Sequence, residues 1–198
     1  MCLARNLLES MFALRLMVLL LFSTPIAATP WFMHCYDYGC KSSTEVRYDE
    51  NQWNEIRAIF AQEMTIFEEK QAIRRAIATM EKFSGEIAGT YRDVGGNIAD
   101  EYIGQHDCID ESTNTFQYLA ALEELNLLKS HRVIPKQRRI VWLGTHWTAA
   151  IAEIDTGNEF AVDSWYHDNG ELPMIAPLTD WYRKRKFTAA YNPELETL

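Results

Sequence analysis

The chain has 198 residues, of which 47% are hydrophobic and 12% aromatic, and it carries a formal net charge of -9 at pH 7. This length and apolar content suffice for one hydrophobic core and leave little room for a second domain. The negative charge argues against a nucleic-acid partner, because phosphate contacts need clustered Lys and Arg.

The first 28 residues have the pattern of a targeting segment. Arg5 and Arg15 precede an apolar run from Leu16 to Phe22, and small residues follow as far as Ala28. This order predicts a secretory signal peptide over residues 1–28, cleaved near Ala28. An uncleaved N-terminal membrane anchor is the alternative, although the run is shorter than the roughly 20 residues that span a bilayer. We therefore expect an exported protein, periplasmic or extracellular or anchored to the inner membrane, with one domain over residues 29–198.

Three cysteines remain if Cys2 is removed with the signal. Cys35 and Cys40 bracket the turn-like segment YDYG, and a short-loop disulfide between them would suit an exported protein. Cys108 is then left over. A free thiol in an oxidising compartment is a liability unless it is buried or used, so Cys108 is either a small core residue or a reactive thiol.

Two helical regions are predicted in the first two thirds of the chain. From Asn51 to about Phe83, apolar residues recur at spacings of three and four, which predicts one amphipathic helix or two in succession. After a glycine-containing loop, helical spacing returns at Phe116, Leu119, Leu122 and Leu125, and Asp107 is placed to cap the first turn. Cys108 is therefore expected at a helix N-terminus.

The period changes after this helix. The segments HRVIPK, RRIVWLG, HWTAAIAEI and NEFAVDSW are rich in Val, Ile and aromatic residues and are separated by turn signals, which predicts an antiparallel sheet. Helices first and strands second indicate an α+β domain in which the Cys108 helix packs on the sheet. The C-terminal segment is expected to add a short helix after Pro177, whose basic end, WYRKRKF, we interpret as solvated rather than as a binding patch.

A histidine and an aspartate lie on neighbouring predicted strands. The midpoint between His146 and Asp163 falls between Ile154 and Asp155, beside the turn signal at 155–157. If the hairpin turns at this midpoint, the two residues face each other across the ladder, but the sequence does not fix the register. A shift of two residues would make them diagonal neighbours, about 7 to 8 Å apart, and an odd shift would place them on opposite faces. Each also has an ordinary interpretation, His146 as a strand residue and Asp163 as a turn cap. With Cys108 at a helix start, however, the three together match one mechanism, in which a base held by a third group activates a thiol.

The segments DCIDESTNTFQYLAAL, THWTAAIAEI and FAVDSW resemble the transglutaminase-like superfamily, in particular the bacterial transglutaminase-like cysteine proteinases. The resemblance runs from about residue 97 to residue 165. It implies a transglutaminase-like, papain-like fold and carries a catalytic triad onto Cys108, His146 and Asp163. One departure is that Asp107, Asp110 and Glu111 surround the cysteine with negative charge, which opposes thiolate formation unless His146 outweighs them or they point to solvent.

The resemblance implies a cysteine-dependent acyl-transfer enzyme that acts on a peptide or protein substrate, and the N-terminal segment predicts that it is exported. Transfer of the acyl group to water would make it a protease or amidase, and transfer to an amine a transglutaminase. The oxyanion would be held by the Cys108 backbone N–H and a second donor, for which Gln105 and Tyr102 are candidates. The alternative is a catalytically inactive exported transglutaminase-like binding module whose groove is lined by aromatic residues: Trp147, Trp165, Tyr166, Trp181 and Tyr182.

No cofactor or metal is expected from the sequence. His106 and Cys108 lie close together, but no second CxxC or HxxxH motif supplies the remaining ligands of a zinc site. The segment DNG at 168–170 lacks the regular acidic spacing of a calcium loop and is interpreted as a turn.

Overall fold

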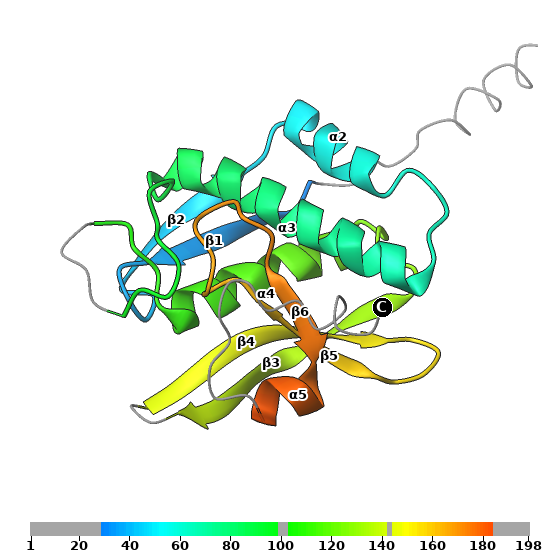
Figure 1. Ribbon diagram of the computed structural model, residues 1–198. Coiled ribbons are helices and arrows are strands. Elements are labelled where there is room, and N and C mark those ends of the chain that lie inside the picture. Colours follow the sequence, from blue (N-terminus) through cyan, green and yellow to red (C-terminus); the bar gives the residue numbers. More distant parts are fainter. Residues whose placement is uncertain (1–28, 99–102, 142–143, 184–198) are drawn as a thin grey trace, which may run out of the picture.

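The structure is a computed structural model that describes residues 29–98, 103–141 and 144–183. It is an α+β fold, as predicted, with a two-stranded hairpin, a four-stranded antiparallel sheet and helices that pack between and around them (Figure 1). The predicted signal segment, residues 1–28, lies outside the described residues. Over the described ranges, none of the helices combines the length and the apolar character needed to span a bilayer.

The chain enters the fold through a hairpin that the sequence analysis did not predict. Strands β1 (Trp31–Tyr36) and β2 (Ser42–Arg47) pair antiparallel, and the cysteines at the turn, Cys35 and Cys40, form the disulfide considered from the sequence. All turn residues at positions 37–40 have positive φ, between 55° and 73°. Such a run is unfavourable for residues other than glycine, so the disulfide and the contacts of the turn hold it in place.

Two helices follow in succession, as one of the two sequence alternatives had it. Helix α2 (Glu50–Ile59) and helix α3 (Ile66–Ala88) each begin with a capping box, at Asp49 and Thr65 respectively. Helix α3 ends at Gly89, whose φ of 79° is the left-handed value that commonly closes a helix.

Helix α4 (Cys108–Glu124) begins at the predicted cysteine. Its N-cap is Asp107, whose carboxylate accepts hydrogen bonds from the N–H groups of Ile109 and Asp110. The Asp110 side chain accepts in return from the Asp107 N–H, at 3.2 Å, which completes a capping box. The sequence prediction of the helix start and of its cap is confirmed.

The sheet is a meander with strand order β3-β4-β5-β6. Strand β3 (His131–Val141) combines two of the predicted runs into one, with a register shift between Ile134 and Gln137 around Pro135, which has no N–H for the ladder. Strands β4 (Gly144–Glu153) and β5 (Glu159–Asp163) follow, and then β6 (Met174–Pro177), which was not predicted. Helix α5 (Leu178–Arg183) confirms the short helix expected after Pro177.

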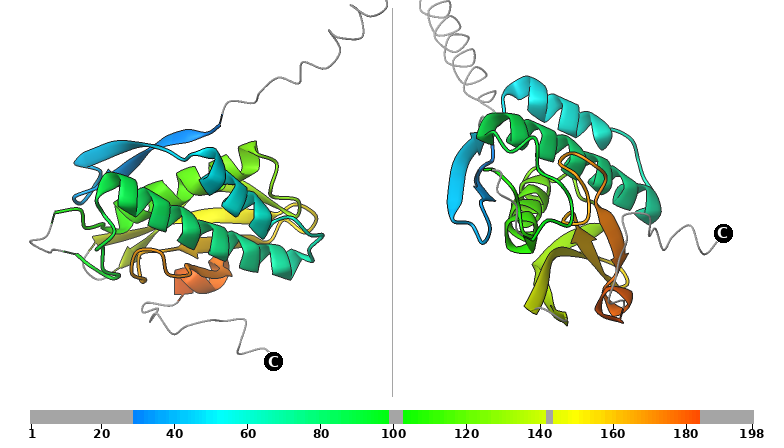
Figure 2. Two further views of the ribbon diagram at one scale, coloured as in Figure 1. Left: turned by 90° about the horizontal axis from the view of Figure 1, so that it is seen from above. Right: turned by 60° about the vertical axis from the view of Figure 1, so that its left-hand side comes forward.

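Both faces of the sheet are covered. One face carries the larger core, formed with α3, α4 and the hairpin by residues that include Ile77, Leu119 and Ile151. The other face carries a smaller core with α5, in which Trp181 is completely buried. Helix α4 therefore lies between the β1–β2 hairpin with α3 on one side and the sheet on the other (Figure 2). This position fixes its N-terminus, and with it Cys108, against the start of β4.

Candidate active site

Cys108 is partly exposed at the first residue of α4 and is the one free cysteine of the described residues. Its Sγ lies 3.7 Å from the backbone oxygen of Thr145, the residue before His146 on β4. The Asp107 cap satisfies the N–H groups of Ile109 and Asp110, and within the described part of the chain the Cys108 N–H has no acceptor. An N–H of this kind at a helix N-terminus can bind an anion or an oxyanion.

His146 and Asp163 are brought together by the β4–β5 ladder. Ala149 pairs with Val162, so Asp163 lies opposite residue 148 and His146 is its diagonal neighbour. Of the registers that the sequence left open, the one observed is the two-residue shift that makes the pair diagonal neighbours, because the turn is centred one residue beyond the point between Ile154 and Asp155. The two side chains still share a face, and His146 Nε2 lies 2.7 Å from Asp163 Oδ2.

The remaining ring nitrogen of His146, Nδ1, is the one available to Cys108, because Nε2 is used by Asp163. Burial alone would lower the pKa of His146, but the charge of Asp163, its hydrogen bond and the neighbouring Cys108 raise this pKa to about 9. The imidazole is therefore held as a cation over the neutral pH range. A base that is held by a carboxylate and lies next to a thiol is the pairing that nucleophilic catalysis by a cysteine requires.

Three aromatic rings enclose His146. Trp165, Tyr166 and Trp181 have ring centroids 5.0, 5.3 and 5.7 Å from that of the imidazole. Of the residues expected to line a groove in a binding module, these three thus surround the histidine. Such a setting excludes water and strengthens the interaction of His146 with Asp163.

Besides packing against His146, Trp181 holds Asp163 in place, a role that sequence reasoning missed. Its Nε1–H donates to Asp163 Oδ2 at 2.8 Å, so the carboxylate oxygen that faces His146 is held from α5 as well. Arg139, the β3 partner of His146 in the ladder, donates to the Trp181 backbone oxygen and, at 2.9 Å, to the Tyr166 hydroxyl. The sequence offered no signal for this support, because it connects α5, β3 and β5 through side chains far apart in the chain.

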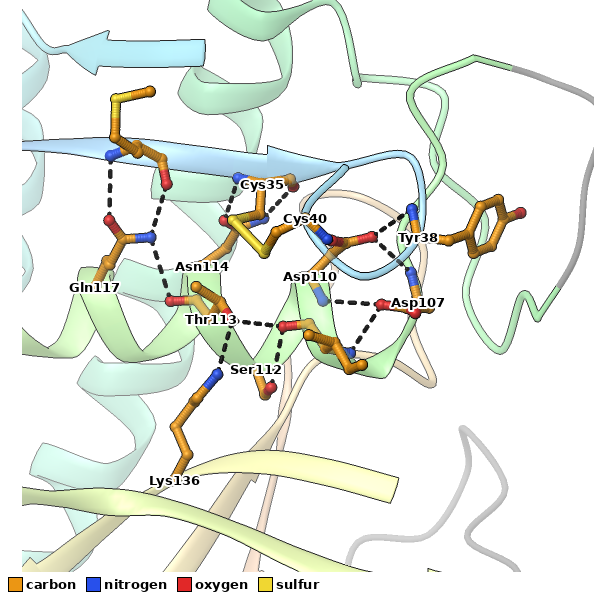
Figure 3. Close-up of a disulfide and its surroundings, with 12 residues drawn as sticks. Cys35, Tyr38, Cys40, Asp107, Asp110, Ser112, Thr113, Asn114, Gln117 and Lys136 are labelled. Atoms are coloured by element: carbon orange, nitrogen blue, oxygen red, sulfur yellow. Dashed lines mark hydrogen bonds between the residues drawn. A yellow bond between two sulfur atoms is a disulfide. The ribbon is translucent and has the colours of Figure 1, made fainter. Parts of the chain in front are cut away.

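Of the three acids near Cys108, Asp110 and Glu111 point into the protein, whereas the half-buried Asp107 caps the helix. Asp110 is fully buried and accepts hydrogen bonds from the N–H groups of Tyr38 and Cys40 in the disulfide turn (Figure 3). Glu111 is buried beside His106, and burial raises the pKa of both Asp110 and Glu111. The sequence alternative in which these acids point to solvent is therefore not the one observed, and the charge of His146 is the feature that opposes theirs.

The two candidates for a second oxyanion donor have different outcomes. Tyr102 lies outside the described residues. Gln105 is buried, donates from its amide nitrogen to the Arg92 carbonyl and accepts from the N–H of Val94 and from Asn97. Its side chain thus organises the loop that precedes α4.

A second group of ionisable side chains lies just before the triad. His106, two residues ahead of Cys108, is in contact with Asp93 and Glu111, and all three are buried. Of the described residues, this is the group of His, Cys, Asp and Glu side chains that is compact enough to hold a metal ion. Cys108 is not part of it, so the pairing of His106 with Cys108 considered from the sequence does not describe this group.

No family model, no curated protein and no solved structure matches this chain.

Proposed function

We propose that this chain is an exported cysteine-dependent acyl-transfer enzyme of the transglutaminase-like type, a protease or amidase that uses Cys108, His146 and Asp163 as its catalytic triad. The observation that carries the proposal is the 2.7 Å contact between His146 and Asp163, on a histidine whose other ring nitrogen is left for a partly exposed thiol at a helix start. A thiol, an imidazole and a carboxylate in this order support the proposal, because covalent acyl transfer uses a nucleophile, a base and a group that orients the base.

The proposed reaction begins with the Cys108 thiolate and the His146 imidazolium. Sγ attacks the acyl carbon, and the electron pair of the C=O bond moves onto oxygen, which the Cys108 N–H stabilises. Collapse of this intermediate breaks the bond from carbon to nitrogen, and His146 Nδ1 gives its proton to the departing amine. A water molecule then attacks the thioester while His146 takes its proton, which releases the carboxylic acid and the cysteine.

Asp163 has an orienting role in this proposal. By accepting from Nε2, it keeps Nδ1 directed at Cys108 and stabilises the imidazolium. Trp181 touches neither substrate nor thiol, so it is a positioning residue that acts through Asp163.

Export is supported by two features that are independent of the triad. The disulfide between Cys35 and Cys40 is of a kind that persists in oxidising compartments. The first 28 residues have the order of charged, apolar and small residues of a secretory signal.

The rate of Cys108 alkylation by iodoacetamide as a function of pH tests the proposal. We expect the folded protein to react well below pH 8.5, about the value at which an unperturbed thiol titrates. His146→Ala should lose this reactivity at low pH, whereas His167→Gln, a change to a histidine outside the triad, should keep it. A thiol that reacts at the rate of the denatured chain, with no effect of His146→Ala, would contradict the proposal and favour the inactive binding module.

The fate of the acyl group needs a second experiment. The active protein and Cys108→Ser are incubated with a proteome-derived peptide library in the presence of a biotinylated primary amine. New peptide N-termini that depend on Cys108 identify a protease, and biotin incorporation that depends on Cys108 identifies a transglutaminase. If the active protein and Cys108→Ser give the same new N-termini and the same biotin incorporation, the chain is neither a protease nor a transglutaminase that acts on peptides.

A further inference from the structure

The buried group Asp93, His106 and Glu111 is built from three separate places in the chain. Asp93 lies in the loop after α3, His106 immediately before the Asp107 cap, and Glu111 in the first turn of α4. Asp93 Oδ2 and Glu111 Oε1 lie 3.1 and 3.0 Å from the same atom, His106 Nδ1, and the three donor atoms all lie within 4.8 Å of one another.

The histidine at the centre of this group has no hydrogen bond from its ring. His106 is 2% exposed, and among the described residues neither Nδ1 nor Nε2 has a hydrogen-bond partner, although two carboxylate oxygens lie within 3.1 Å of Nδ1. The contacts therefore have the distance of a hydrogen bond without its direction. Donor atoms that share one metal ion at 2.0 to 2.2 Å are also roughly 3.3 Å apart in a tetrahedral site, so the separation fits ligands that converge on a common centre.

The charge of the surroundings also fits a cation. Glu81 of α3 is a further buried carboxylate that interacts electrostatically with both His106 and Glu111. If ionised, these three carboxylates would outweigh even a protonated imidazole, and the excess negative charge in the interior would be costly unless a cation or bound protons compensate it.

We propose that Asp93, His106 and Glu111 bind one divalent ion of the zinc class, with a water molecule or Glu81 as a further ligand. An imidazole with two carboxylates is a ligand set that suits zinc and its neighbours, whereas calcium prefers six to eight oxygen ligands. Because the three ligands are buried, the ion has a structural role. It ties the loop after α3 to the first turn of α4, two residues from Cys108, and this inference does not depend on the proposed function.

The test uses the Cys108→Ser protein, so that metal binding to the thiol and His146 cannot contribute. The chain is purified without chelators, its metal content is measured by mass spectrometry, and the ion is then removed and zinc or cobalt is titrated back by calorimetry and visible absorption. We expect one zinc per chain and a higher melting temperature with zinc than without. We also expect bound cobalt to give the visible spectrum of a site with nitrogen and oxygen ligands. Added zinc should displace the cobalt and abolish this spectrum.

Two glutamate variants in the same helix make the assignment specific. Glu111→Gln removes a ligand and should weaken zinc binding roughly tenfold or more, whereas Glu124→Gln, at the exposed end of α4, should bind as the parent does. Zinc binding that is unchanged by Glu111→Gln would overturn the proposal. If Glu111→Gln does not fold, metal binding by the Cys108→Ser parent alone tests the proposal. A folded parent that binds neither zinc nor cobalt stoichiometrically would contradict it and show that protons neutralise the cluster.

Discussion

At the scale of single residues, the setting of His146 decides what the site can do. Its ring is enclosed by three aromatic side chains and held by a buried carboxylate, which in turn is held by an indole N–H. In the folded chain the imidazole thus keeps its proton up to about pH 9. Substitution of the carboxylate should change the charge of the ring, and substitution of the indole should change its position.

Asp163→Asn is expected to flatten the pH dependence of stability. The pKa of His146 is raised from 6.5 to about 9 by folding, so the stabilisation is complete below about pH 6.5 and is lost as the pH rises through 9. The difference corresponds to at most about 3 kcal/mol. Urea unfolding between pH 5 and pH 10, in a Cys108→Ser background so that the thiol does not titrate, measures the Asp163 contribution. If the free energy of unfolding depends on pH in the same way with and without the Asp163→Asn substitution, Asp163 does not raise the pKa of His146.

Trp181→Phe is expected to misplace Asp163. Loss of the indole donor should lower the free energy of unfolding by about 1.5 to 3 kcal/mol, the range for a hydrogen bond to a charged group. It should also lower the alkylation rate of Cys108 at low pH. Trp165→Phe is the matched control, because Trp165 also contacts His146 but donates to the Asn97 carbonyl. Equal losses in the two variants would assign the effect to packing around His146.

At the scale of elements, the start of α4 is held by the disulfide turn. Asp110 accepts from the N–H groups of Tyr38 and Cys40, and Asn114 one turn later exchanges hydrogen bonds with both backbone groups of Cys35 (Figure 3). The positive φ values of the turn direct its N–H groups toward the carboxylate, as in other anion-binding backbone turns. The turn thereby fixes the helix that carries the proposed nucleophile.

The double variant Cys35→Ala/Cys40→Ala should lose about 2 kcal/mol of stability, the chain-entropy value for so short a loop. It should also increase amide hydrogen exchange in the first turn of α4. Because the effect on α4 passes through Asp110, Asp110→Asn should produce the same local increase, and the three substitutions together should cost less than the sum of their separate effects. Strict additivity in unfolding and exchange would show that the turn and the helix start are independent.

Helices and strands were predictable where a local sequence pattern, such as a capping residue or apolar spacing, determines them. The start of α4 followed from Asp107 and the apolar spacing, and both cap and helix were found in place. Strand β1 was missed because a histidine, His34, occupies one of its buried positions and conceals the alternation. The register of β4 on β5 stayed open between facing and diagonal positions of His146 and Asp163, because it depends on the shape of the turn and not on the strands that the turn joins.

At the scale of the whole molecule, we expect the chain to be exported and shortened. When it is produced with its first 28 residues in a Gram-negative host, the folded protein should be recovered from the periplasm with a new N-terminus near Thr29. Intact mass measurement and N-terminal sequencing of each cell fraction check this. A full-length chain in the inner membrane would favour the uncleaved anchor, and a full-length chain in the cytoplasm would contradict export altogether.

The overall class and the three proposed catalytic residues were within reach of the sequence, but their surroundings were not. Cys108, His146 and Asp163 each stand in a recognisable local pattern. The contacts of Asp93 with His106, of Trp181 with Asp163 and of the disulfide turn with Asp110 join segments that become neighbours only through the packing of several elements. A single sequence contains no periodicity that encodes such contacts.

The three residues of the proposed triad belong to α4, β4 and β5, so they meet only when the helix has docked on the closed meander. If the chain crosses a membrane unfolded, as the proposed export implies, it has no assembled reaction centre while it is still inside the cell that makes it. The topology would then act as a built-in latency, because the chemistry becomes possible only after translocation and folding are complete.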